Sequence, residues 1–235
     1  MAFFCLVSDG IGRSPDKMIW IGCTLVLDGQ GVQVGKGTWG GEPLTIRPLL
    51  CVHELRIRNW EKLKPAFQNF KLLEVLDFKG FEITQGQFPT TIGNLIHLRY
   101  LNLSNSRIRV LPSSIANLRC LNTLDLSQDF SYIMKIRSRE EIPNVLWKMQ
   151  QLRHLYLPWR YKIIHAKKLR LHMLTNLEIL RYIDPNKCCV EGLIKLKNLR
   201  KLHIHAIKSI EQLEVIFKPL CPVLSVVSFL QWEEI

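Results

Sequence analysis

A glycine-rich stretch at residues 28–41, DGQGVQVGKGTWGG, is the first place where residue types and spacing could do chemistry. A phosphate-binding P-loop needs G-x-x-x-x-G-K-[ST], because its backbone amides cradle the phosphates and its hydroxyl ligates magnesium. When the motif is aligned on Gly35 and Lys36, Gln30 replaces its first glycine and Gly37 replaces its Ser or Thr. The motif therefore fails at both ends.

Within this stretch, the shorter phrase GKGTWG does fit the dinucleotide-binding spacing G-x-G-x-x-G. Such a loop must open a helix, but GEPLTIRP follows and places two prolines there. The sequence also lacks the motifs H-R-D, D-F-G, G-x-S-x-G and H-E-x-x-H. We therefore interpret the stretch as a flexible segment and expect neither an enzyme nor a cofactor. A nucleotide-binding enzyme that uses this stretch is kept as a minor alternative.

Histidine and cysteine are the remaining candidates for metal or redox chemistry. His203 and His205 flank Ile204 and share one face of a strand, but the sequence fixes no third ligand near them. We favour a solvent-facing pair over a metal site. The seven cysteines, including the adjacent Cys188 and Cys189, contain no C-x-x-C pair. Their odd number and irregular spacing indicate reduced thiols of a cytoplasmic protein.

One phrase repeats along most of the chain. Three apolar residues at offsets of three and two, L-x-x-L-x-L, begin at Leu98 and again 23 residues later at Leu121. The steps between units run from 21 to 31 residues, and only the longest falls outside the roughly 20–29 residues of leucine-rich repeats. We assign that step to an inserted loop over Gln128–Glu141. The first positions of the units are Val52, Leu73, Leu98, Leu121, Leu152, Leu177, Leu199 and Leu224.

A second phrase returns in the same register. FPTTIGNL, LPSSIANL and IPNVLWKM each place a proline nine residues before the next unit's first leucine. Apolar spacing of three and four after a proline predicts a short helical or 3₁₀ turn, and the alternating x-L-x-L half predicts a strand with inward leucines. One unit cannot cover its own apolar face, so units must stack.

The predicted fold is therefore an α/β leucine-rich-repeat solenoid of about seven to eight repeats. It is curved, with a parallel sheet on the concave face and short turns on the convex face. Residues 46–235 form this domain, whereas residues 1–45 are an unassigned glycine-rich segment, either a cap or disordered.

Side chains alternate across a strand, so the residues between the inward leucines face the concave side. Tyr, Trp and Arg, the types that dominate binding hot spots, occur among them. Thr123 and Gln128 belong to this face as well. The candidates for partner binding are Arg56, Arg58, Asp77, Lys79, Tyr100, Asn102, Asn105, Asp125, His154, Tyr156, Trp159, Arg181, Lys201, His203 and His205.

The net charge of +12 is concentrated in residues 152–208, which hold thirteen Lys and Arg against three acidic residues. Such a surface favours a protein partner with an acidic face. Direct nucleic-acid binding would rest on charge alone, because no recognised module of stacking aromatics accompanies the basic residues. No apolar run approaches the ~18 residues of a membrane span.

With these phrases in place, the chain resembles the repeat region of plant intracellular nucleotide-binding leucine-rich-repeat disease resistance proteins. The coiled-coil class of the downy-mildew and late-blight resistance type is the most similar. FQNFKLLEVLD, IGNLIHLRYL and IPNVLWKMQQLRHLYLP carry the resemblance, which covers the chain from about residue 50 to its end. The G-x-IP phrase of secreted plant receptors is absent.

The resemblance implies a cytoplasmic immune module that senses a pathogen effector or a host protein. It also implies that the module holds a neighbouring nucleotide-binding domain at rest, although this sequence contains no such domain. If Met1 is the start of the protein, a decoy, a regulator of a full-length relative and a truncated product remain open. A general leucine-rich-repeat adaptor unrelated to immunity is the alternative, but adaptors tend to keep a regular period, which these steps do not.

Overall fold

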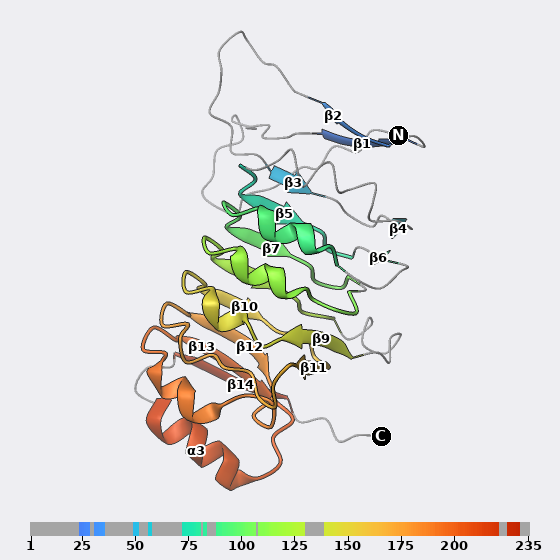
Figure 1. Cartoon of the computed structure of the whole chain (residues 1–235). Coiled ribbons are helices and arrows are strands. Elements are labelled where there is room, and N and C mark those ends of the chain that lie inside the picture. Colours follow the sequence, from blue (N-terminus) through green and yellow to red (C-terminus); the bar gives the residue numbers. More distant parts are fainter. Residues whose placement is uncertain are drawn as a thin grey trace, which may run out of the picture.

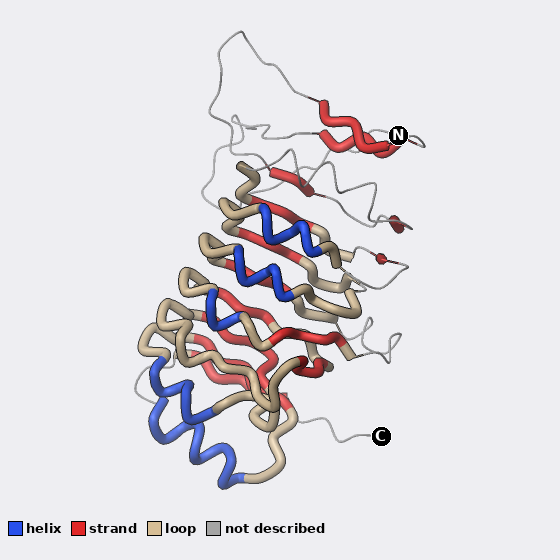
Figure 2. Tube along the Cα trace, viewed as in Figure 1, coloured by secondary structure: helices blue, strands red, loops and turns tan. Residues whose placement is uncertain are grey.

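The computed structural model describes ten segments of the chain: 24–28, 31–35, 49–51, 56–57, 72–80, 82–83, 88–106, 108–129, 139–220 and 225–230. The repeat units stack along one axis, with a continuous sheet on one side and short helices on the other (Figure 1). Figure 2 shows the same separation of strands and helices along the whole stack. The predicted solenoid is therefore confirmed. The division of domains at residue 45 stays a prediction.

The main sheet contains eight parallel strands in the order β14-β13-β12-β10-β8-β7-β5-β3. This order follows the sequence because each repeat adds one strand beside the previous one. The backbone pairing sets Leu76, Leu101, Leu124 and Leu155 directly against one another. The strands are β3 (Leu49–Cys51), β5 (Val75–Asp77), β7 (Tyr100–Asn102), β8 (Thr123–Asp125), β10 (His154–Tyr156), β12 (Ile179–Ile183), β13 (Lys201–His205) and β14 (Val226–Leu230).

Three two-stranded sheets accompany the main one. They are the antiparallel pair β1 (Thr24–Asp28) and β2 (Gly31–Gly35), and the parallel pairs β4 (Arg56–Ile57) with β6 (Glu82–Ile83) and β9 (Glu140–Pro143) with β11 (Tyr161–Ile164). Two sequence-based interpretations are corrected by them. Part of the glycine-rich stretch is strand β2, and the last two residues of the predicted inserted loop belong to β9.

A short turn of 3₁₀ helix lies in the returning half after β5, β7, β8 and β12, and the prolines predict the first three of these turns. The connection between β10 and β12 contains strand β11 instead. Pro89 and Pro112 each directly precede such a turn, at ψ angles of 137° and 147°, because a proline is extended more readily than it continues a helix. The turns are η2 (Thr90–Asn94), η3 (Ser113–Asn117), η4 (Leu146–Lys148) and η5 (Val190–Lys195).

The last connection, between β13 and β14, is a true helix, α3 (Ile210–Leu220), which the repeat pattern did not predict. Ser209 caps it: the Ser209 hydroxyl accepts from the backbone N–H of Gln212 at 3.3 Å. The Gln212 side chain in turn accepts from the backbone N–H of Lys208 at 3.1 Å. Two backbone donors at the start of the helix are satisfied in this way.

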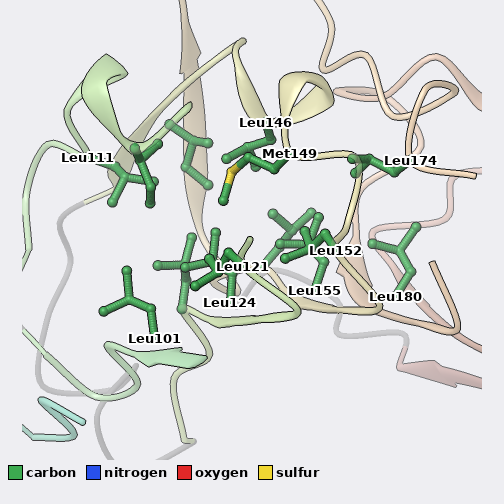
Figure 3. Packing of buried hydrophobic residues seen from close by; sticks show 14 of the residues in the cluster. Leu101, Leu111, Leu121, Leu124, Leu146, Met149, Leu152, Leu155, Leu174 and Leu180 are labelled. Carbon is green, nitrogen blue, oxygen red and sulfur yellow. The ribbon is translucent and has the colours of Figure 1, made fainter. Parts of the chain in front are cut away.

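One apolar core runs through the stack between the sheet and the turns. Figure 3 shows strand leucines such as Leu101, Leu124 and Leu155 facing Leu111 and Met149 from the other side. All of these side chains are at most 3% exposed. Since full burial of a leucine stabilises a fold by about 1.5–3 kcal/mol, this row is the main source of stability.

The first strand of the main sheet, β3, lies five residues earlier than the sequence predicts. Leu50 of β3 pairs with Leu76, so the unit does not begin at Val52. At the repeat offsets the sequence has Val52 and Ile57 around Leu55, but Arg47 and Val52 around Leu50, so the pattern favours Leu55. Only the pairing with β5 shows that Leu50 is the centre of the strand. Arg56 consequently lies in β4, opposite Glu82, and not in the concave sheet. Arg58 lies outside the described residues.

Strand β12 also departs from the repeat pattern. The sequence predicts Tyr182 as an inward residue, but the pairing shifts between Leu180 and Ile183, and Ile183 takes the buried position opposite Ile204. Tyr182 adopts a positive φ of 62°. This irregularity leaves Tyr182 half-buried, packed against the core but outside the inward row.

Candidate functional site

Backbone pairing arranges the outward residues of successive strands into two rows on the concave face. The first row is Val75, Tyr100, Thr123, His154, Ile179 and Lys201, and the second row is Asp77, Asn102, Asp125, Tyr156 and Arg181. Eight of the candidates from the sequence therefore stand side by side across the sheet. The residues between the rows are the buried leucines, as strand alternation requires.

The second row has a structural task in the first half of the sheet. Asp77, Asn102 and Asp125 each accept a hydrogen bond, at 2.8–2.9 Å, from the backbone N–H two residues further on. This Asx turn ends each strand in the same way. Asn102 is buried, whereas Asp77 and Asp125 are partly exposed.

Two further candidates join neighbouring repeats. Asn105 binds Asp129 in the next unit through two hydrogen bonds of 2.7 Å, one to its side chain and one to its backbone N–H. Gln128 donates to Glu140 of β9, whose pKa burial raises to about 8 despite that bond. Lys79 is exposed beside the turn at Asp77.

The first half of the sheet is acidic around Tyr100. Burial, and after it the charges of Asp77 and Asp125, raise the pKa of the Tyr100 phenol to about 12. Burial and Asp125 also raise the pKa of Tyr156, although the charge of Arg181 opposes them. The negative potential of the two carboxylates thus extends across the middle strands.

The second half of the sheet carries four rings in mutual contact, which we call the ring cluster: Trp159, Tyr182, His203 and His205. Trp159 stacks on His205 with centroids 4.6 Å apart and meets Tyr182 edge to face at 5.9 Å. Tyr182 in turn lies 4.8 Å from His203. The rings come from three successive repeats, so the cluster binds these repeats together on their concave side.

The two histidines do not face solvent, which corrects the sequence-based interpretation. His203 is 8% and His205 is 4% exposed, because rings from the preceding repeats cover them. The Nε2–H of His205 donates to the carbonyl of Tyr182 at 3.0 Å. Within the described part of the chain, His203 Nε2 is buried without a hydrogen-bond partner.

Burial favours the neutral form of both histidines. It lowers the pKa of His205 to about 4, with Lys187 adding to the effect and Asp184 opposing it. Burial and the charge of Arg181 lower the pKa of His203 as well. Positive charge around the ring cluster therefore comes from Arg181 and Lys201.

His154 of the first row is also shifted towards the neutral form. Its Nδ1 lies 3.0 Å from the Thr123 hydroxyl in the neighbouring strand, and burial lowers its pKa. The pair links β8 to β10 at the border between the two halves of the sheet. His154 is therefore part of a hydrogen-bonded contact, and its burial favours the neutral ring.

The basic region of residues 152–208 is mostly unpaired. Arg153 lies 3.5 Å from Glu178, Lys162 lies 3.9 Å from Glu141, and Lys187 lies 2.8 Å from Asp184. Among the described residues, no carboxylate makes an ion pair with the other ten. Arg181 instead holds its guanidinium 5.9 Å from the centroid of the Tyr156 ring.

The buried hydroxyl of Tyr161 forms polar contacts inside the core. The Tyr161 hydroxyl accepts from the backbone N–H of Asp184 at 3.1 Å and lies 3.6 Å from the Cys188 sulfur. Burial raises the pKa of the Cys188 thiol to about 12 and keeps it protonated. This environment makes Cys188 a packing residue and not a nucleophile.

The described segments contain neither a metal cluster nor a membrane span. No group of three His, Cys, Asp or Glu within them is placed to hold a metal ion. None of their helices has the length and hydropathy needed to cross a bilayer.

The sequence missed Tyr182 as a concave residue. The sequence does contain a sign of it: in LEILRYIDP, the apolar Ile183 follows directly after Tyr182, which occupies the third position of the L-x-x-L-x-L pattern. An extra residue in a strand is the mark of a β-bulge. Without the neighbouring strand, however, the pattern L-x-x-L-x-Y fits the repeat equally well.

Comparison with known proteins agrees with this geometry. The family model described as a leucine-rich repeat region matches residues 53–231. The disease resistance protein RPP8 of Arabidopsis thaliana is 37% identical over 145 residues, which cover 62% of this chain and 15% of RPP8. RPP8-like protein 3 of the same plant is 36% identical over 161 residues, 68% of this chain and 17% of the relative. This chain spans less than a fifth of the length of the curated relatives it matches.

Among solved structures, internalin C2 of Listeria monocytogenes superposes with a TM-score of 0.55 at 22% identity, over 79% of this chain and 81% of that one. At this identity the likeness concerns the fold alone. The resemblance to plant disease resistance proteins, expected from the sequence, is confirmed by the curated relatives.

Proposed function

This chain belongs to the leucine-rich-repeat region family, and we propose that it recognises a pathogen effector, or a host protein that an effector alters, in plant defence. The observation that carries the proposal is the contrast between the two faces of the sheet. The inward row keeps leucine from repeat to repeat, whereas the outward neighbours change from Tyr100 to Thr123 to His154. A constant core under a varied surface is what recognition of a specific protein requires.

A second contact is proposed for the basic region of residues 152–208. In relatives about four times as long, most of the protein lies outside the matched repeats. We propose that the unpaired cations bind an acidic face, either on the recognised partner or on a nucleotide-binding domain of a full-length receptor. Attraction of this kind weakens as salt is added, since exposed charges are screened beyond about 8 Å at physiological ionic strength.

The proposed mode of action is binding alone, in the cytoplasm and without a cofactor. The failed P-loop pattern and the seven unpatterned cysteines support this proposal. A general adaptor is less well supported, because the matched relatives are named as disease resistance proteins.

Disruption of the gene in the source plant tests the proposal. We expect higher growth of at least one pathogen isolate on the disrupted line, with normal growth of uninfected plants. An adaptor unrelated to immunity would give the reverse, a growth defect without infection and unchanged pathogen numbers. Re-expression of the full chain provides the control.

A further inference from the structure

The charges of the concave face are separated along the stack. In the two rows, the strands β5, β7 and β8 contribute the carboxylates of Asp77 and Asp125 and no cation. The strands β12 and β13 contribute Arg181 and Lys201 and no carboxylate. The two rows are therefore acidic at one end and basic at the other, with Lys79 exposed outside them beside Asp77.

The carboxylates remain available to a partner. The Asx turns use one oxygen of Asp77 and of Asp125, namely Oδ1. Both residues are partly exposed, and burial with these two charges already disfavours ionisation of Tyr100 between them. The negative potential of these two carboxylates would attract a cation of the partner.

The basic end is preorganised. Arg181 and Lys201 are exposed and have no ion-pair partner among the described residues. The Tyr156 ring holds the guanidinium of Arg181 on the concave side. Next to Arg181, the ring cluster is fixed by stacking and by the bond from His205 to the Tyr182 carbonyl, so little side-chain entropy would be lost on binding.

We propose that this face binds an extended segment of a partner protein that crosses the strands, with acidic side chains over β12 and β13 and basic side chains over β5 to β8. The inference rests on the proposed function only in taking the concave face as the binding surface. Asp77 and Arg181 lie four strands apart, about 19 Å at the usual spacing, which about six extended residues would span. The ring cluster would pack against the apolar part of that segment.

A nucleic acid does not fit this face. Its phosphates would meet two cations at one end but would be repelled by Asp77 and Asp125 at the other. An all-acidic protein segment meets the same repulsion. Charge complementarity therefore selects a segment with both signs, in a fixed order.

A library of random twelve-residue peptides, selected on the full chain, provides the test. We expect enriched peptides with acidic residues at one end and basic residues at the other. For the best of them, Arg181→Glu with Lys201→Glu should weaken binding at least about tenfold, and so should Asp77→Lys with Asp125→Lys. The matched control, Arg119→Glu with Lys218→Glu, reverses two exposed charges outside the rows and outside residues 152–208, and it should leave affinity unchanged.

The ring cluster is tested with the same peptide. Trp159→Ala should weaken binding about tenfold, whereas Trp159→Phe should retain most of it. Since Trp159→Ala could also loosen the fold, unfolding by denaturant is measured on each variant.

Enriched peptides without opposite charges at their ends, or affinity that ignores both charge reversals, would overturn the inference. A photo-crosslinker on the acidic end of the peptide independently measures the direction in which the peptide binds. We expect it to attach to β12 or β13, and attachment to β5 or β7 contradicts the proposed direction. The defence proposal fails separately, if gene disruption leaves pathogen growth unchanged while these binding results hold.

Discussion

The repeats of residues 73–127 and those of residues 152–205 share one core but differ in regularity. In the first group, η2 and η3 each have five residues after a proline, and each strand has three residues in unbroken register. In the second group, β12 and β13 have five residues, and the register shifts between Leu180 and Ile183. The ring cluster lies where the regularity is lost.

This difference separates two tasks within one fold. Regular units stack with the least strain and supply the core, because each presents the same shape to its neighbour. An extra residue in a strand moves one side chain out of the inward row, as it does at Tyr182, which is half-buried beside the core. The irregular half can therefore carry a specific site without interrupting the row of leucines.

The largest expected effect tests whether the core is shared by both halves. Leu101→Ala in the regular half and Leu180→Ala in the irregular half should each lower the free energy of unfolding by about 2–5 kcal/mol. Both side chains are fully buried in the same cluster. Chemical denaturation measures the change, and a much smaller loss for Leu180→Ala would mean that the halves do not share one core.

The second largest effect is a pH dependence of stability that arises from His205 in the irregular half. Since burial lowers the pKa of His205 to about 4, the unfolded chain binds more protons than the folded chain between about pH 6.5 and 4. Stability should therefore fall as the pH is lowered through this window, by up to about 3 kcal/mol. His205→Asn should flatten the dependence.

Glu140 acts in the opposite direction and serves as the control for this measurement. The pKa of Glu140 is raised from 4.5 to about 8, so the folded chain binds more protons than the unfolded chain between these values. The stability that protonated Glu140 contributes is therefore present at low pH and is lost as the pH rises through 8. Denaturation at several pH values in a Glu140→Gln background isolates the histidine. An unchanged slope after His205→Asn would contradict the assignment.

Close packing between regular repeats is tested at Gly93. A Cβ on Gly93 would lie 2.6 Å from the carbonyl oxygen of Ser114 in the next turn, so Gly93→Ala should cost about 1–3 kcal/mol. Ala116 occupies the corresponding position one repeat later. Ala116→Gly should cost only about 1 kcal/mol, since it removes one methyl group and adds backbone freedom. Thermal or chemical unfolding measures the stability of both variants. An equal loss of stability in the two would argue against a clash at Gly93.

The smallest expected effects concern two equivalent positions with positive φ. Gly80, at 70°, and Ala206, at 56°, each follow the last inward residue of a strand by two positions. Gly80→Ala should lower stability by about 1 kcal/mol, because a side chain disfavours this conformation. Ala206→Gly should raise it by up to about the same amount. A loss of stability in both variants would show that side-chain contacts outweigh the backbone preference.

Much of the fold was predictable because its determinants are local. Leu98, Leu101 and Leu103 return at Leu121, Leu124 and Leu126, and strand alternation then fixes which side chains point inward. Pro89 and Pro112 identify the turns.

The first unit and the candidate site were predicted less well. Leu50 and Leu55 are alternative centres for the first strand, and the choice needs the neighbour at Leu76. Burial of His203 and His205 depends on Trp159 and Tyr182, which lie more than twenty residues away from at least one of them. Such contacts leave no periodic signal in the sequence.

By itself, the sequence determined that this protein is a stack of leucine-rich repeats, because a leucine pattern of fixed offsets can be buried only against copies of itself. It also determined which residues stand on the concave face in the regular units. The tertiary structure alone decided the register of β3 and of β12, the burial of His203 and His205, and the assembly of the ring cluster. These depend on side chains of adjacent repeats meeting across the sheet, and that meeting is set by pairing between strands and not by any one strand's own residues.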